Sequence, residues 1–187
     1  MVSRNSSLDE TKGLVKKCLS QLYAEDTFIL ERNNGKGVCE RSIVFRFAHY
    51  LQNGIPNYFV DCDFNSSFEN YIDSRGNTAG RERHGKPIEN EDGSVTKRFV
   101  DIIVHKRDYS TRTQNDLVCF EIKKWNNTNP GEINKDKNNL RVMTSRYGYI
   151  YGFYISIHKV KTKTQWIIFR NGRPLGQEAK VFERSST

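Results

Sequence analysis

The sequence predicts an α/β fold in which helices flank a central mixed β-sheet. The first observation is that segments with helical hydrophobic periodicity stand on both sides of segments whose side chains alternate with period two. The second is their order, which reads helix, helix, strand, polar insertion, strand, strand, helix, strand, strand. Such interspersed elements indicate a sheet covered by helices. The third is the length of 187 residues, which fits one compact domain over 1–187.

Three segments predict helices. Residues 6–26 carry acidic side chains in what would be the first turn, and their apolar side chains recur at helical intervals. Residues 39–54 show the same periodicity and end at an Asn-Gly pair, which commonly stops a helix. A third helix is expected within residues 129–148, with Gly148 as its stop. The first of these is an extra N-terminal helix.

Five apolar segments predict strands. They are residues 58–64, 98–106, 116–125, 149–160 and 164–172. Alternation makes one face of the first strand more polar than the other, whereas the next two strands are apolar enough to be buried. Between them, roughly residues 65–97 are polar and contain glycine, so we expect a long loop or a hairpin insertion there.

The charge of the chain favours a polyanionic partner. Lys and Arg number 30 against 22 Asp and Glu, which gives a net charge of +8. Each basic side chain that neutralises a phosphate releases condensed counterions, so nucleic acid is a natural partner for such a chain. Charge alone does not distinguish nucleic-acid-binding proteins from other basic proteins.

The cysteine spacing and the lengths of the apolar segments indicate the cellular compartment of the protein. No Cys-x-x-Cys pair occurs among the four cysteines, so neither a zinc site nor a disulfide framework is indicated. They are Cys18, Cys39, Cys62 and Cys119. No leader pattern begins the chain, and no apolar run approaches the ~18 residues of a membrane span. We therefore expect a cytoplasmic protein with no membrane partner.

Two carboxylates interrupt apolar strands. Asp101 and Glu121 each stand between apolar neighbours, where an unpaired charge is costly, so each requires a cationic partner or a metal ion. Because side chains alternate along a strand, Glu121 and Lys123 share one face, and Asp101 can meet Glu121 if the two strands are neighbours. Two carboxylates and an ammonium suit magnesium- or manganese-assisted hydrolysis of a phosphodiester. The alternative is a buried ion pair of one carboxylate with Lys123.

The segments RFVDIIVHKRD and LVCFEIKKW resemble the Asp…Glu-x-Lys signature of the PD-(D/E)XK nuclease superfamily. The order of elements over roughly residues 38–170 resembles the αβββαβ core of that superfamily. This resemblance implies a restriction-endonuclease-like fold and a Mg²⁺- or Mn²⁺-dependent endodeoxyribonuclease. It also implies that Asp101, Glu121 and the backbone carbonyl of Ile122 bind the metal and that Lys123 is catalytic. Val100 stands where the motif has proline.

Further acidic residues are candidates for the same site. In that superfamily a Glu from the preceding helix often joins the metal site, and Glu40 has this position near the start of the helix predicted over 39–54. A first-turn Glu that is stabilised by the helix dipole is the alternative. Asp61 and Asp63, on the predicted strand over 58–64, are weaker candidates for a second metal or a turn contact.

Basic side chains flank the candidate site in sequence and are candidates to follow a phosphate backbone. They are Lys97, Arg98, Lys124, Lys135, Lys137 and Arg141. Trp125 is available to stack on a base. For any one of these lysines or arginines, a solvated rim is the alternative interpretation.

The sequence thus predicts a metal-dependent nuclease, and the resemblance implies that it acts on DNA. The rival hypothesis is a nuclease-fold module that binds nucleic acid or a protein partner without cleaving. Cleavage of both strands by subunits with one site each would need two copies, so a homodimer is compatible with the first hypothesis.

Overall fold

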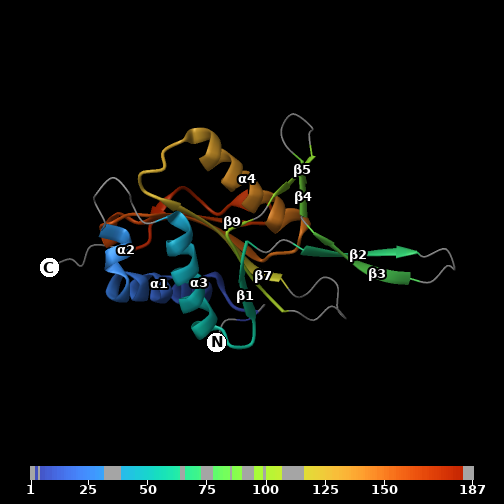
Figure 1. Cartoon of the computed structure of the whole chain (residues 1–187), viewed down its shortest axis with the longest axis horizontal. Helices are drawn as coiled ribbons and strands as arrows, with labels where there is room; N and C mark the ends of the chain where they lie inside the picture. Colours follow the sequence, from blue (N-terminus) through green and yellow to red (C-terminus); the bar gives the residue numbers. More distant parts are fainter. Residues whose placement is uncertain are drawn as a thin grey trace.

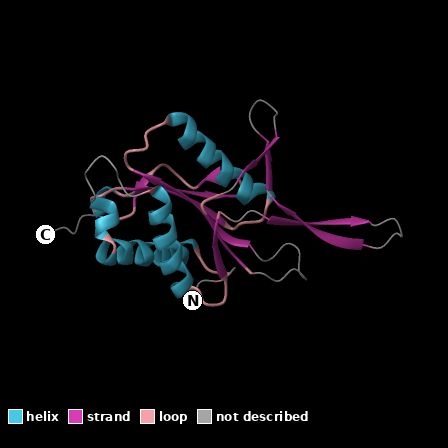
Figure 2. Ribbon diagram, viewed as in Figure 1, coloured by secondary structure: helices cyan, strands magenta, loops and turns pink. Residues whose placement is uncertain are grey.

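A mixed β-sheet with helices on both faces forms the centre of the molecule (Figures 1 and 2). The computed structural model describes residue 3 and residues 5–31, 39–63, 66–72, 78–84, 86–89, 95–98, 100–106 and 116–182; of residues 66–72, 78–84, 86–89 and 95–98 it describes the backbone. The prediction of an α/β fold with a mixed sheet flanked by helices is confirmed.

The strands of the central sheet follow the order β1-β6-β7-β8-β9-β10, and β11 also pairs with β9. They span Phe59–Cys62 (β1), Ile102–His105 (β6), Asp116–Lys124 (β7), Tyr151–Ile157 (β8), Gln165–Arg170 (β9), Arg173–Pro174 (β10) and Ala179–Lys180 (β11). A 3₁₀ turn, η1 (Lys161–Lys163), lies between β8 and β9. Strands β7 and β8 are parallel, and the other pairings are antiparallel. The carboxyl ends of β7 and β8 therefore emerge side by side.

Helices α1 (Leu8–Glu25), α2 (Thr27–Glu31) and α3 (Glu40–Gly54) pack on one face of the sheet, and α4 (Pro130–Arg146) packs on the other (Figure 1). Side chains alternate along the strands, so each strand contributes to the cores on both faces of the sheet. Phe120 and Ile122 of β7 join the core beneath α1 and α3. Cys119 of the same strand joins a second core with Leu140 and Met143 of α4. The helix covers the face to which the odd-numbered residues of β7 belong.

A glycine lets α4 approach the sheet closely. A Cβ atom at Gly152 in β8 would lie 3.2 Å from the Cβ and Cδ2 atoms of Leu140 and from Cγ2 of Thr144. Contacts of this length are tight, so a side chain at this position requires Leu140 and Thr144 of α4 to give by a few tenths of an ångström. The absence of a side chain at Gly152 thus allows α4 to pack closely on β8.

The polar segment between β1 and β6 forms two antiparallel hairpins. They consist of β2 (Ser66–Ile72) with β3 (Thr78–His84), and β4 (Lys86–Glu89) with β5 (Val95–Arg98). Both extend away from the central sheet (Figure 1). Of the two predicted forms for roughly residues 65–97, the hairpin insertion is the one that the structure contains. No helix in the described part of the chain combines the length and apolarity required to cross a membrane.

A buried carboxylate joins α1 to α3. Asp26, which ends α1, accepts hydrogen bonds at Oδ2 from Arg46 Nε (2.7 Å) and from the Tyr50 hydroxyl (2.5 Å). Burial acts to raise the pKa of Asp26, but the hydrogen bonds from Arg46 and Tyr50 outweigh it and hold the pKa below its ordinary value. The ionised form of Asp26 therefore stabilises the folded state.

We expect Asp26→Asn to lower the free energy of unfolding by about 1–3 kcal/mol at neutral pH, because the hydrogen bonds to a charged acceptor are lost. The wild-type advantage is present above the unfolded pKa of about 3.9 and disappears as the pH falls through the lower folded pKa. Urea unfolding of both proteins at about pH 7 and about pH 2.5 measures this. A difference that is unchanged at low pH would contradict the role of the charge.

Candidate functional site

The two carboxylates of the motif meet on the face of the sheet that α4 covers. Strand β6 pairs antiparallel with β7 so that Ile102 lies opposite Phe120, which brings Asp101, one residue earlier, level with Glu121. The prediction that Asp101 lies inside a strand is wrong, because β6 begins at Ile102. The Asp101 side chain instead accepts a hydrogen bond at Oδ2 from the Ile122 backbone amide, at 2.7 Å.

Burial makes the ionised forms of both carboxylates costly. Desolvation raises the pKa of Asp101 to about 6, although the Ile122 amide and the Lys123 ammonium act in the opposite direction. Glu121 is 3% exposed, and burial followed by the negative charge of Asp101 raises its pKa well above the ordinary value. A divalent cation between them would offset this repulsion.

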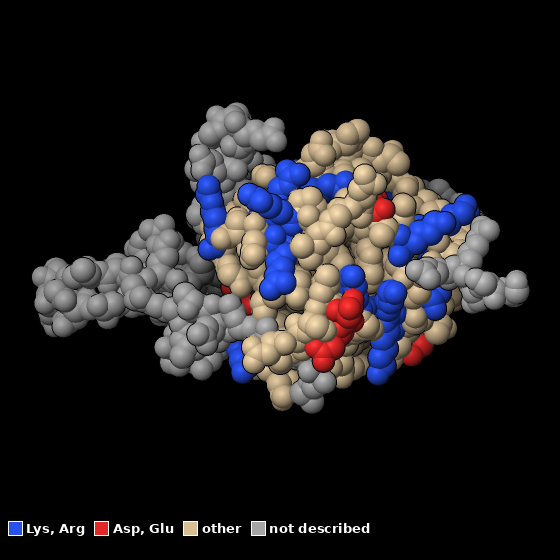
Figure 3. Space-filling view, turned by 180° about the vertical axis from the view of Figure 1, so that it is seen from behind, with Lys and Arg blue, Asp and Glu red and all other residues tan. Residues whose placement is uncertain are grey.

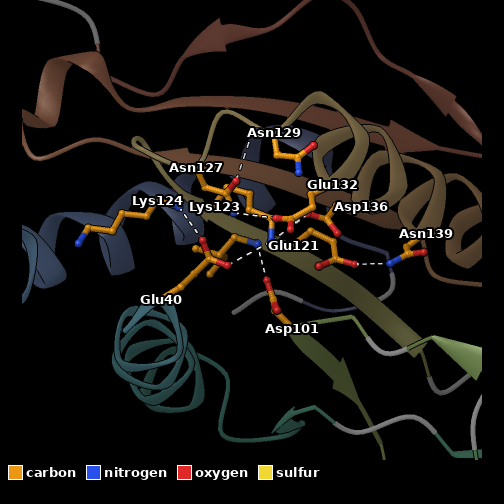
Figure 4. Close-up of polar contacts among 11 residues, drawn as sticks. Glu40, Asp101, Glu121, Lys123, Lys124, Asn127, Asn129, Glu132, Asp136 and Asn139 are labelled. Atoms are coloured by element: carbon orange, nitrogen blue, oxygen red, sulfur yellow. Dashed lines mark hydrogen bonds and ion pairs between the residues drawn. The ribbon is translucent and has the colours of Figure 1, made fainter. Parts of the chain in front are cut away.

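Lys123 lies between two carboxylates (Figure 4). Its Nζ atom is 3.1 Å from Glu40 Oε1 at the first residue of α3 and 3.1 Å from Asp136 Oδ2 of α4. Burial acts to lower the pKa of Lys123, but the negative charges of Asp136 and Glu40 outweigh it and raise the pKa above its ordinary value. Lys123 is therefore a cation at neutral pH and suits electrostatic stabilisation better than proton abstraction.

Glu40 connects the candidate site at β6 and β7 to helix α3, which lies on the opposite face of the sheet from α4. Besides its contact with Lys123, it accepts a hydrogen bond at Oε2 from the Lys124 backbone amide, at 3.0 Å. The start of α3 is therefore tied to the carboxyl end of β7. The structure brings the Glu40 carboxylate to Lys123. A favourable position at the start of its own helix is therefore not the whole role of this side chain.

Three residues of the site were not predicted from the sequence. Asn139 of α4 donates a hydrogen bond from Nδ2 to Glu121 Oε1 at 2.8 Å, and Asp136 holds the Lys123 ammonium. Tyr154 is opposite Glu121 in the parallel pair β7–β8, and burial followed by the charge of Asp136 raises its pKa. Asp136 and Asn139 lie at helical intervals from Ile133, Leu140 and Met143, which face the sheet from α4. This spacing is the sequence signal that could have placed them at the site.

The residues predicted to bind phosphate differ in exposure and in their distance from the carboxylates. Lys135 and Arg141 are exposed on α4, and Lys137 Nζ lies 5.1 Å from the centre of the Tyr154 ring. Lys124 is only 7% exposed and points away from the carboxylates (Figure 4), with its Nζ 4.9 Å from the centre of the Trp125 ring.

Other predicted residues lie outside the candidate site or outside the description. Lys97 and Arg98 belong to β5, and their side chains lie outside the described residues. Asp61 Oδ2 contacts His105 Nε2 at 2.7 Å, and Asp63 is exposed with a positive φ of 52°. The Asp63 amide donates to the Asp101 carbonyl at 3.1 Å, which continues the antiparallel pairing of β1 and β6 by one residue.

The arrangement offers hard oxygen donors to a small cation. Among the described residues no group of three or more His, Cys, Asp or Glu side chains is gathered as a metal site. Mg²⁺, however, commonly takes only one or two protein carboxylates and completes its shell with water and substrate phosphates. Asp101 and Glu121, two buried carboxylates whose charges repel one another, are donors of this kind.

Comparison with known proteins gave no match. No protein-family model matches the chain, and neither the curated proteins nor the solved structures contain a match.

Proposed function

We propose that the chain is a metal-dependent nuclease of the PD-(D/E)XK type with a restriction-endonuclease-like core, and that it hydrolyses phosphodiester bonds of DNA. The observation that carries this proposal is the meeting of Asp101, Glu121 and Lys123 on one face of the sheet, with Glu40 beside Lys123. These are the residues that the sequence resemblance names. DNA as the substrate rests on that resemblance and on the net charge of +8.

Each residue has a distinct part in this proposal. Asp101, Glu121 and the carbonyl of Ile122 would hold Mg²⁺ or Mn²⁺, which when bound supplies a Lewis acid and an activated water. Lys123 stabilises the negative charge that develops on the phosphate during attack. Asp136 is a positioning residue for Lys123, and Asn139 is a positioning residue for Glu121.

A second candidate function is a module that binds nucleic acid or a protein without cleaving. The observation that favours it is that the Lys123 ammonium already has two carboxylate partners, Glu40 and Asp136, within the chain. In that case the polar cluster is structural, and the Lys123 ammonium, not a metal ion, balances the carboxylates of Glu40 and Asp136.

The two functions differ in a cleavage assay. Plasmid and single-stranded DNA are incubated with the protein in Mg²⁺, in Mn²⁺ or in EDTA, with Asp101→Asn as the control for contaminating nucleases. We expect cleavage by the wild type in the presence of metal and none in EDTA. Binding of DNA without cleavage in either metal would favour the second function and overturn the first.

Metal binding is measured independently of catalysis. We expect Mn²⁺ to raise the thermal unfolding midpoint of the wild type by several degrees, because an ion that binds only the folded state stabilises it. Asp101→Asn should lose this shift, since one of the two carboxylates is gone. Asp9→Asn, which removes an exposed carboxylate of α1, should keep it. Equal shifts in all three proteins would place metal binding elsewhere.

A further inference from the structure

The positive charge of the chain is concentrated in one stretch. Residues 137–177 contain eight Lys and Arg and no Asp or Glu, so this stretch alone carries a charge equal to the whole net charge of +8. The eight residues are Lys137, Arg141, Arg146, Lys159, Lys161, Lys163, Arg170 and Arg173. Basic side chains are spread over the described part of the face in Figure 3, with few acidic ones among them.

Three of these residues lie in the segment that follows β8. Lys159 and Lys163 are exposed, and Lys161 is half-buried with its Nζ 4.6 Å from the centre of the Phe182 ring. The backbone here is held in place, because the Val160 amide donates to His158 Nδ1 at 2.8 Å and the Lys163 amide donates to the Val160 carbonyl at 2.9 Å. We call residues 158–163 the basic segment.

An aromatic side chain adjoins the basic segment. The Trp125 amide donates to the Ile157 carbonyl at 3.0 Å, which extends the parallel pairing of β7 and β8 by one residue. The Trp125 and His158 rings are tilted to one another with centres 5.7 Å apart. The indole is half-buried, with Lys124 Nζ near its ring. Trp125 therefore has a fixed place next to a cluster of cations.

This surface continues directly from the candidate site. Trp125 is two residues beyond Lys123, immediately after β7 ends at Lys124, and the intervening Lys124 amide donates to Glu40. Ser156, two residues before His158, lies opposite Lys123 in the β7–β8 pair. The carboxyl ends of neighbouring parallel strands are common ligand-binding positions in α/β sheets. A strand whose phosphate is near Lys123 can therefore run on to Trp125 and the basic segment.

We propose that Trp125 and the basic segment form a binding surface for single-stranded nucleic acid adjacent to the cleavage site. Lysines bind the phosphates of either single or double strands, whereas stacking on an indole needs a base that is not already stacked within a duplex. The surface therefore selects strands with unpaired bases beyond the scissile phosphate. This inference rests on the proposed nuclease function and specifies its substrate class.

The test measures binding in EDTA, by fluorescence anisotropy of a labelled single strand and of a duplex of equal length. Trp125→Leu keeps an apolar side chain but removes the stacking surface. We expect it to weaken single-strand binding about 5- to 100-fold, to leave duplex binding unchanged, and to be rescued by Trp125→Phe. Unchanged single-strand affinity in Trp125→Leu, or an equal loss for both DNAs, would overturn the proposal.

A charge-matched pair of triple variants tests the basic segment. The first variant changes Lys159, Lys161 and Lys163 to Ala. The second changes three exposed arginines outside the basic segment to Ala, namely Arg146, Arg170 and Arg173. We expect the first to reduce the slope of log affinity against log salt by about 2 for single strands and the second to change it little. Equal effects would show that only net charge matters, and melting curves confirm folding of each variant.

The outcomes separate this inference from the proposed function. If the wild type shows the stacking-dependent preference but cleaves no DNA in Mg²⁺ or Mn²⁺, the nuclease function fails and the binding surface stands. If the wild type cleaves DNA but Trp125→Leu binds like the wild type, the nuclease function stands and the surface fails. A wild type that binds no DNA would contradict both.

Discussion

Lys123→Met is expected to reduce metal-dependent DNA cleavage about 100- to 1,000-fold, which is the usual effect of removing one preorganised charge from an active site. Methionine keeps an unbranched apolar side chain of similar reach but carries no ammonium. The loss should appear in the rate of the chemical step under saturating DNA, because Lys123 acts on charge that develops during attack. Single-turnover cleavage of a labelled substrate measures it.

The control for this variant must separate catalysis from folding. Lys123→Met leaves Glu40 and Asp136 without their shared cation, so its melting temperature is compared with that of the wild type. Lys17→Met makes the same change at an exposed position of α1 and should leave the rate unaltered. Cleavage by Lys123→Met at the wild-type rate would remove Lys123 from the mechanism, whatever the stability of the variant.

Phe120→Ala is expected to lower the free energy of unfolding by about 3–5 kcal/mol. Phe120 is 1% exposed on β7, with its ring centre 5.5 Å from those of Phe47 and Phe153. It joins α3 to the sheet directly opposite the face that carries Glu121, so its loss leaves a cavity between two layers. Denaturant unfolding at neutral pH measures the change.

A phenylalanine on the surface provides the matched control. Phe45 of α3 is 70% exposed, and Phe45→Ala should change the free energy of unfolding by less than about 0.5 kcal/mol. A similar loss in Phe120→Ala and Phe45→Ala would mean that Phe120 does not pack between α3 and the sheet.

The elements that could be predicted are those with long periodic patterns. Helices α1, α3 and α4 and strands β7, β8 and β9 bury a continuous stripe or face, and this requirement shapes the sequence over many residues. The five-residue α2 and the two-residue β10 and β11 were not predicted, because their sequences are too short to show a period. Their formation depends on neighbours that are distant in the sequence.

The residues of the candidate site that could be predicted are those that break an apolar pattern, together with Glu40, which the family resemblance indicated. Asp101 and Glu121 stand out because their neighbours are apolar, and Lys123 follows from alternation along β7. Asp136 and Asn139 lie in a helix that is polar along much of its length, where another acid or amide attracts no notice. Their helical spacing indicates an inward position, but their contacts with Lys123 and Glu121 depend on how α4 packs on the sheet.

Gly152 gives the site a dependence on a residue that has no functional group. It lets α4 lie close to β8, and Asp136 and Asn139 of that helix contact Lys123 and Glu121. A substitution there would change the electrostatic surroundings of the site while every charged and amide side chain stays in the sequence. The identity of residue 152 is thus an indirect control on the charge balance around Lys123, and a search confined to polar residues would overlook it.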